Sequence, residues 1–228
     1  MKFKNPFSDL SKFELILWLT SILVIISTFL LSGGKDILTI IASLIGVTAL
    51  IFVAKGYVIG QVLTVVFAVF YGIISFFFHY YGEMITYLCM TAPIAIFTVI
   101  SWLKHPYEGT KEVKVHKLTK KQFLFMIIAA ALTTTAFYFI LAALENANLL
   151  FSTISVITSF VASYLTFVRS PYYAVGYAAN DLVLIVLWVL ATLENISYLP
   201  MVICFVMFFV NDIYGFYNWQ QMQKRQHS

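Results

Sequence analysis

The fold of this chain is decided by two apolar stretches, ILTIIASLIGVTALIFVA at Ile37–Ala54 and LLFSTISVITSFVASYLTFV at Leu149–Val168. An α-helix needs about 20 such residues to cross the roughly 30 Å hydrocarbon core of a bilayer, so each stretch predicts a transmembrane helix. A basic residue follows each stretch, Lys55 or Arg169. The two stretches also match each other at an offset of 115 residues, at Ser43, Thr48, Leu50, Phe52 and Val53 in the first and Thr158, Ser163, Leu165, Phe167 and Val168 in the second. The chain is therefore predicted to contain an internal duplication.

Apolar segments of similar length fill almost the whole chain of 228 residues. They are Phe13–Ser32, Ile37–Ala54, Tyr57–Phe78, Met84–Leu103, Gln122–Leu144, Leu149–Val168, Tyr172–Leu193 and Tyr198–Asn218. Hydrophobic residues make up 61% and charged residues only 11% of the sequence, whereas soluble domains carry about 25% charged residues. The sequence therefore predicts an all-α membrane protein with eight transmembrane helices and no separate extramembrane domain.

Basic residues set the orientation of these helices. When the segments are threaded alternately, thirteen of the 14 Lys and Arg residues fall on the side of the termini, and only Lys35 falls on the other. The thirteen are Lys2, Lys4, Lys12, Lys55, Lys104, Lys111, Lys114, Lys117, Lys120, Lys121, Arg169, Lys224 and Arg225. Loops rich in Lys and Arg stay in the cytoplasm, so both termini are predicted to lie inside. The net charge of +4 then reflects topology and does not call for a nucleic-acid partner.

The duplication predicts a specific architecture. Segments two to four and six to eight run in the same direction through the membrane, and the fifth segment inverts the chain between them. Further weak matches join Tyr71 with Trp188 and Trp102 with Trp219. Two parallel three-helix repeats joined by an inverter helix are the layout of the SWEET sugar transporters, here with an extra N-terminal helix. The expected divisions are residues 1–36 for the N-terminal segment and extra helix, 37–103 for repeat one, 104–144 for the basic loop and inverter, 145–219 for repeat two and 220–228 for a cytoplasmic tail.

Polar side chains at membrane depth gather in the last two segments, as the pairs Asn180-Asp181 and Asn211-Asp212. Polar groups are costly in lipid and normally face protein or a water-filled cavity. Helical spacing also places tyrosines and Trp188 on the stripe of Asp181, which would form a wall suited to a small, flat, hydroxylated solute. The candidate substrate-binding residues are Asn180, Asp181, Trp188, Tyr173, Tyr177, Gln61, Asn211, Asp212 and Tyr214. The alternative interpretation is that these groups hydrogen-bond between helices.

The residues of other site types are missing from the sequence. The four histidines stand in loops or at segment ends without metal-ligand spacing, and there is no phosphate-binding glycine loop or nucleophile elbow. We therefore expect no metal, no cofactor and no enzymatic activity. No Lys or Arg lies within the segments to pair with a carboxylate, which favours uncoupled facilitated diffusion. Net uptake would then depend on trapping of the solute inside the cell. Pro93 is a candidate hinge in the fourth segment.

Three motifs carry a resemblance to a known family. They are FVRSPYY at residues 167–173, Asn180-Asp181 followed by Trp188, and NDIYGFYNW at residues 211–219. Together with size, segment count and the basic loop after segment four, they resemble the PnuC family of bacterial vitamin transporters along nearly the whole chain. Many members have a tryptophan early in the seventh segment, where this chain has Tyr172 and Tyr173.

The resemblance implies a SWEET-like fold in the bacterial cytoplasmic (inner) membrane and facilitated passage of nicotinamide riboside by alternating access. It also implies a cytoplasmic riboside kinase that traps the vitamin by phosphorylation. Nicotinamide riboside carries a pyridinium cation, an amide and hydroxyls, which suit aromatic rings, Asn180 and Asp181. Thiamine, also a cation, or another vitamin is an alternative substrate on the same fold. A membrane receptor or assembly factor is the alternative of another class, and the composition is compatible with a homo-oligomer.

Overall fold

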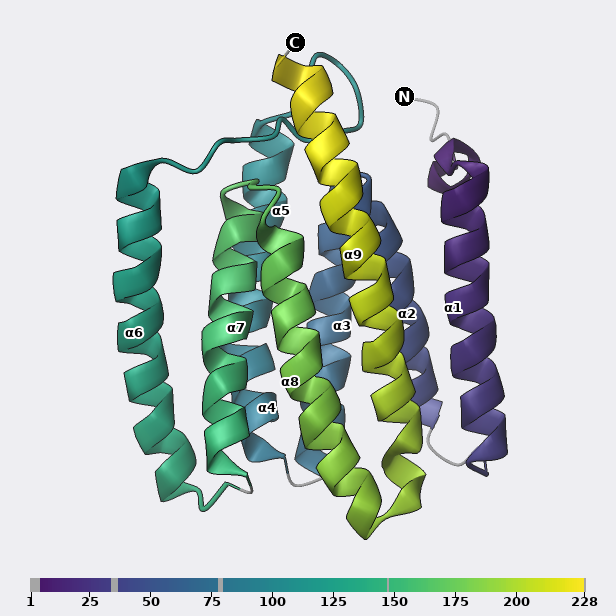
Figure 1. Cartoon of the computed structure of the whole chain (residues 1–228), viewed down its shortest axis with the longest axis vertical. Coiled ribbons are helices and arrows are strands. Elements are labelled where there is room, and N and C mark those ends of the chain that lie inside the picture. The colour runs from purple at the N-terminus through teal and green to yellow at the C-terminus, as the bar shows by residue number, and fades with distance from the viewer. Residues whose placement is uncertain (1–4, 34–36, 78–79, 147, 228) are drawn as a thin grey trace.

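The computed structural model describes residues 5–33, 37–77, 80–146 and 148–227. Within these residues, eight helical segments are long and apolar enough to cross a membrane, which confirms the expected all-helical fold (Figure 1). Their bounds are Lys12–Leu31 (α1), Ile37–Ala54 (α2), Val58–Phe77 (α3), Tyr81–Lys104 (α4 to α5), Lys120–Ala143 (α6), Leu149–Phe167 (α7), Tyr173–Glu194 (α8) and Ile196–His227 (a 3-10 turn and α9). Capping boxes, in which Ser11 and Thr119 bind backbone N–H groups, begin α1 and α6.

The fourth membrane-spanning segment is not a uniform α-helix. It consists of α4 (Tyr81–Ile85), a π-helical turn η2 (Thr86–Thr91) and α5 (Ala92–Lys104). The π turn ends two residues before Pro93, which has no N–H to donate to the helix. The helix also begins three residues earlier than expected. As a result, Glu83, which falls between the expected segments Tyr57–Phe78 and Met84–Leu103, lies inside the helix and is buried.

The turns that end α2 and α7 have the same hydrogen-bond pattern. The N–H of Gly56 donates to the carbonyl of Val53 at 2.8 Å, and the N–H of Arg169 donates to the carbonyl of Thr166 at 3.0 Å. Both Gly56 and Arg169 have positive φ, +68° and +61°, as residues that terminate helices often do. Val53 therefore corresponds to Thr166, 113 residues later. The sequence matched Val53 with Val168 instead, so its register at these turns is two residues out.

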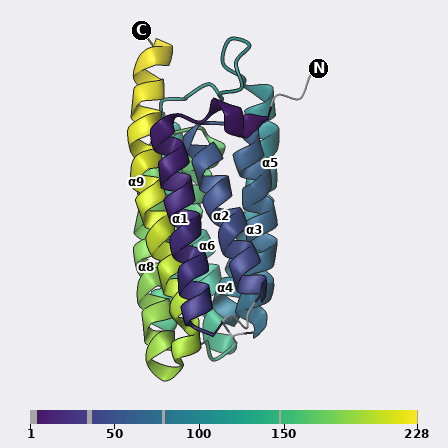
Figure 2. The same cartoon turned by 90° about the vertical axis from the view of Figure 1, so that its right-hand side faces the viewer.

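Two groups of three spanning segments form the centre of the molecule. In the first, α2 and α5 pack against α3, and in the second, α7 and α9 pack against α8. We call these groups bundle one and bundle two; they meet where α2 contacts α9 and α5 contacts α7. Helix α6 lies outside α7, and α1 lies against α2 and α9 (Figures 1 and 2). Within bundle one, α2 and α3 approach closely at Gly60, where an added Cβ would lie 2.4 Å from the backbone nitrogen of Val53.

Residues 105–119, which we call the strap, cross the end of the molecule where α1 begins and α9 ends (Figures 1 and 2). The N–H of Val113 in the strap donates to the carbonyl of Gly56 at 2.9 Å, and the side chains of Val113 and Val115 are buried. The expected cytoplasmic tail is a helical continuation of α9. Its Gln226 accepts a hydrogen bond from the N–H of Val115 at 2.7 Å, so the tail holds the strap in place.

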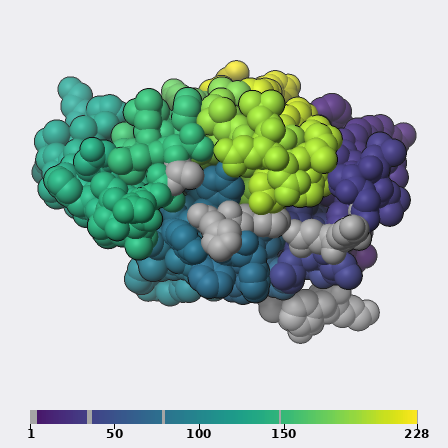
Figure 3. All heavy atoms as spheres, turned by 90° about the horizontal axis from the view of Figure 1, so that it is seen from below, coloured from purple at the N-terminus to yellow at the C-terminus, as the bar shows by residue number. Residues whose placement is uncertain are grey.

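The described basic residues lie at one end of the helix bundle, as the alternate threading of the segments predicted. Those described at the end of the bundle with the strap are Lys12, Lys55, Lys104, Lys111, Lys114, Lys117, Lys120, Lys121, Arg169, Lys224 and Arg225. On this surface Lys111 forms an ion pair with Asp9 at 2.5 Å, and its hydrogen bond holds the pKa of the Asp9 carboxyl below its usual range. Figure 3 views the opposite end, where α1 and α6 flank the central helices.

Candidate functional site

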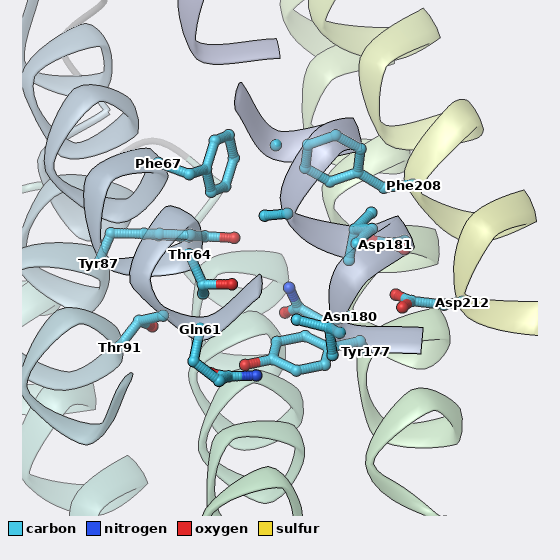
Figure 4. A pocket seen from close by; sticks show the side chains of 14 residues that line it. Gln61, Thr64, Phe67, Tyr87, Thr91, Tyr177, Asn180, Asp181, Phe208 and Asp212 are labelled. Atoms are coloured by element: carbon cyan, nitrogen blue, oxygen red, sulfur yellow. The ribbon is translucent and has the colours of Figure 1, made fainter. Parts of the chain in front are cut away.

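A cavity lies between the two bundles (Figure 4). Its open volume is about 50 Å³, smaller than the roughly 300 to 1,000 Å³ of small-molecule sites, so the side chains that line it must move apart to admit a ligand. Its lining residues are Gly46, Ala49, Leu50 and Val53 of α2, Gln61, Thr64 and Phe67 of α3, Tyr87 and Thr91 of η2, Tyr177, Asn180 and Asp181 of α8, and Phe208 and Asp212 of α9. Both bundles therefore contribute to one enclosed polar and aromatic site.

Two carboxyl groups give the cavity its electrostatic character. Asp181 and Asp212 are each 3% exposed, and Figure 4 shows them on neighbouring helices. The Oδ2 atom of Asp181 has no amide, hydroxyl or basic partner among the described residues. Lys, Arg and His do not occur among the residues that line the described cavity. A buried carboxylate is costly unless a proton or a cation compensates it, so this cavity favours a positively charged ligand and disfavours a phosphate.

The remaining polar groups of the cavity are amides and hydroxyls. Asn180 is 1% exposed, and its Oδ1 accepts hydrogen bonds from Thr158 and Ser159 of α7, both at 2.9 Å. Gln61 of α3 is 2% exposed and lines the cavity from bundle one. The hydroxyl of Thr91 is buried without a partner in the described part of the chain. These groups can bind the carbonyl, amide or hydroxyl groups of a ligand.

Aromatic rings form the rest of the wall. The rings of Phe67 and Phe208 meet edge to face with centroids 5.2 Å apart, and Tyr87 meets Phe67 in the same way at 6.1 Å. The Phe208 ring fits because residue 46 is a glycine, where a Cβ would lie 2.2 Å from the ring atom Cζ. Aromatic faces attract cations, so the wall and the carboxyl groups favour the same kind of ligand.

Of the nine candidate residues from the sequence, the structure brings five together in this cavity. They are Gln61, Tyr177, Asn180, Asp181 and Asp212.

Two further candidates, Trp188 and Tyr173, lie outside the lining residues and make contacts between helices. The indole N–H of Trp188 donates to the hydroxyl of Tyr71 at 2.9 Å, and Tyr173 packs on Trp219 with ring centroids 4.8 Å apart.

Asn211 and Tyr214 also lie outside the cavity lining and face α1. Asn211 donates to the hydroxyl of Ser21 at 3.0 Å. Tyr214 donates to Glu14 at 2.9 Å, and Glu14 also pairs with Lys55 at 3.0 Å. These two candidates therefore hold α1 against α9, and the ion pair of Glu14 with Lys55 holds α1 near the end of α2.

Tyr87 and Thr91 line the cavity, although the sequence analysis selected neither as a candidate. Both lie in the π turn, whose widened helix changes which side chains face the cavity. The nearby Pro93 was the only sequence signal for this irregularity. No group of three or more potential metal ligands occurs among the residues that the structure describes.

Comparison with known proteins identifies the family. The family model of the nicotinamide mononucleotide transporter matches residues 36–221. The nicotinamide riboside transporter PnuC of Neisseria mucosa is 28% identical over 227 residues, which cover 97% of this chain and 86% of that protein. The nicotinamide riboside transporter PnuC of Haemophilus influenzae is 22% identical over 190 residues, which cover 82% and 81% of the two chains.

The crystal structure of the vitamin B3 transporter PnuC matches this structure with a TM-score of 0.84 and 26% identity. The match covers 95% of this chain and 94% of that one. These findings confirm the resemblance that the sequence motifs indicated. The chain is a multi-pass membrane protein that belongs to the nicotinamide mononucleotide transporter family and shares the fold of the transporter PnuC.

Proposed function

We propose that the protein carries nicotinamide riboside across the cytoplasmic membrane of a bacterium. Both relatives named above are nicotinamide riboside transporters from bacteria. The observation that carries the proposal is the cavity between the bundles, which combines the carboxyl groups of Asp181 and Asp212 with aromatic rings and amides. Nicotinamide riboside offers a cationic pyridinium ring, a carboxamide and ribose hydroxyls, so each of its groups has a partner of suitable chemistry there.

The charge of the cavity favours the riboside over its phosphorylated form. A mononucleotide carries a phosphate, and phosphate sites normally supply Arg, Lys or a row of backbone N–H groups. The cavity lining instead contains two carboxyl groups and no basic residue. Thiamine is also a cation and is the closest competitor on charge, but it lacks the carboxamide that Gln61 and Asn180 could bind.

We further propose that transport proceeds by alternating access, in which one bundle rocks against the other. Two matching hydrogen bonds support this mechanism at the end of the bundle with the strap. The indole N–H of Trp219 crosses from bundle two to the carbonyl of Val53 at 2.9 Å, and that of Trp102 crosses from bundle one to the carbonyl of Thr166 at 3.1 Å. Val53 and Thr166 occupy equivalent turns, so the two bonds are related as a twofold axis between parallel repeats would relate them.

The residues near such an axis should contact their own counterparts. Trp102 and Trp219 do so, with ring centroids 5.5 Å apart, and Trp188 is hydrogen-bonded to Tyr71, the residue that the sequence comparison matched with it. These contacts support two parallel three-helix repeats with α6 as the inverter. Opening the end with the strap would separate the two tryptophans and free both indole hydrogen bonds.

The distribution of charge supports the orientation and the energetics of this mechanism. The end with the strap carries the basic residues and is proposed to face the cytoplasm. The spanning segments supply no described Lys or Arg partner for Asp181 or Asp212, which favours uncoupled facilitated diffusion. Uptake would then be driven by a cytoplasmic kinase that phosphorylates the riboside, because the cavity disfavours the phosphorylated product.

Calorimetry with the purified protein tests the proposed substrate. We expect saturable binding of nicotinamide riboside, and no binding of nicotinamide mononucleotide at the same concentrations. Thiamine and riboflavin serve as competitors on the same fold. Binding of thiamine but not of the riboside would keep the cavity and change the vitamin. Binding of the mononucleotide in preference to the riboside would contradict the charge argument.

A further inference from the structure

Two hydroxyl groups of α7 converge on one atom of the proposed site. The Oγ1 atom of Thr158 and the Oγ atom of Ser159 both lie 2.9 Å from Oδ1 of Asn180 in α8. Ser159 and Asn180 are almost fully buried, at 2% and 1% exposure. Neither hydroxyl comes from a residue that lines the cavity, so both contact the Asn180 amide on the side that faces away from the cavity.

The hydrogen-bond partners of these groups fix which way the amide points. No other acceptor for the Ser159 hydroxyl is found among the described residues, so its proton is satisfied only if the amide oxygen faces it. The opposite orientation would leave that buried proton without an acceptor. It would also turn the amide oxygen toward the cavity, where the carboxyl group of the adjacent Asp181 already lies. Both effects are unfavourable in a buried site.

With its oxygen held from behind, Asn180 presents its N–H groups to the cavity. Figure 4 shows Asn180 and Tyr87 approaching the cavity from opposite bundles. Asp181, by contrast, offers an oxygen acceptor without an amide or hydroxyl partner. The cavity therefore has a donor side at Asn180 and an acceptor side at Asp181.

We infer that Thr158 and Ser159 are positioning residues that make Asn180 a donor to the carboxamide oxygen of the ligand. This inference rests on the proposed function. The carboxamide oxygen of the ligand would accept from the Asn180 amide, while the ribose hydroxyls donate to Asp181. Ligands with a carbonyl on the pyridinium ring are then selected over analogues without one, and the two α7 hydroxyls set this selectivity without touching the ligand.

The selectivity between two ligands tests the inference. Nicotinamide riboside and 3-methylpyridinium riboside carry the same charge and ribose, but only the first has the carboxamide. We expect the wild-type protein to bind the first about tenfold more tightly, the effect of one well-placed hydrogen bond. In the double variant Thr158→Val/Ser159→Ala, and in Asn180→Ala, the preference should fall to less than about twofold, while the affinity for the methyl analogue changes little.

Control variants separate positioning from general structural damage. Thr153→Val removes a hydroxyl of the same helix whose one partner among the described residues is the carbonyl of Leu149, at 2.7 Å. This variant should keep the full preference. Ser159→Thr should keep it as well, because the hydroxyl remains. Should the double variant not fold, Thr158→Val and Ser159→Ala are measured singly, and each is expected to lower the preference partway.

The inference is overturned if the double variant keeps the tenfold preference, or if it weakens both ligands in parallel, as a packing defect would. A wild-type protein that binds both ligands equally tightly would overturn it while leaving the proposed function in place. A wild-type protein that binds neither would reject the proposed function itself.

Discussion

Replacing Trp219 by Phe should loosen the end of the molecule with the strap. The substitution removes the indole N–H that donates to the carbonyl of Val53 at 2.9 Å across the two bundles. That carbonyl keeps its hydrogen bond from Gly56 at 2.8 Å, so the loss is one net hydrogen bond, about 1 kcal/mol, and not a fully unsatisfied group. If the closed form predominates, its ratio to the open form falls about fivefold. Trp102→Phe removes the equivalent bond to Thr166 and should act similarly.

Labelling of a cysteine in the cavity measures this change. The reporter is Thr64→Cys in a chain whose two native cysteines, Cys89 and Cys204, are replaced by alanine. A membrane-impermeant maleimide is added to vesicles in which the end with the strap faces the medium. We expect the labelling rate to rise about fivefold in either Trp→Phe variant, in proportion to the open population.

Trp18→Phe is the matched control. It removes an indole hydrogen bond of 3.1 Å, to Thr48, that joins α1 to α2 and does not cross between the bundles. It should leave the labelling rate unchanged. The reasoning is refuted if Trp219→Phe labels at the wild-type rate, or if the Trp18 control accelerates labelling as much.

Three further changes have defined outcomes. Gly46→Ala puts a Cβ 2.2 Å from the Phe208 ring, so the ring must shift at the cavity wall. The riboside affinity measured by calorimetry should fall at least about tenfold, and an unchanged affinity would contradict the cavity assignment. Asp181→Asn combined with Asp212→Asn should weaken binding of the cationic riboside by about 2 kcal/mol, about thirtyfold. This is the effect of losing one net negative charge about 8 Å from the cation at an effective dielectric constant near 20. Equal weakening of an uncharged dihydropyridine riboside would point to lost packing instead. The pKa of Asp9 is lowered in the folded protein, so its ion pair stabilises the protein above the usual carboxyl pKa of 3.8 and ceases to do so as the pH falls through the lowered value. The small difference in melting temperature between wild type and Asp9→Asn should therefore vanish in acid. A difference that persists there would argue against the ion pair.

The spanning helices could be predicted from sequence because bilayer thickness fixes their length and lipid requires an apolar composition. Their ends were less predictable. The start of the fourth segment depends on Gly82, whose N–H donates to the side chain of Asn146, 64 residues later in the chain, at 2.9 Å. A local pattern cannot reveal such a contact. For this reason Glu83 was expected in a loop and is instead buried beside Ser155 at 2.7 Å.

The cavity shows a second limit of periodicity. Trp188 shares a helical stripe with Asp181, but seven residues correspond to about 10 Å along the helix axis. A stripe therefore tells which way side chains point but not at which depth a partner lies. Trp188 meets Tyr71 of the other bundle, whereas Asp181 meets the cavity. The contribution of Tyr87 depends on the π turn, which helical spacing of 3.6 residues does not anticipate.

Uptake of nicotinamide riboside into proteoliposomes tests the central claim most directly. Wild-type protein should let the labelled riboside equilibrate across the membrane without an ion gradient. Internal riboside should accelerate the entry of external label by exchange. The variant lacking both cavity carboxyl groups, Asp181→Asn/Asp212→Asn, should take up label at no more than about one tenth of the wild-type rate. Uptake by the wild type that does not exceed that of empty liposomes, or a double variant that transports at the full rate, would contradict the account.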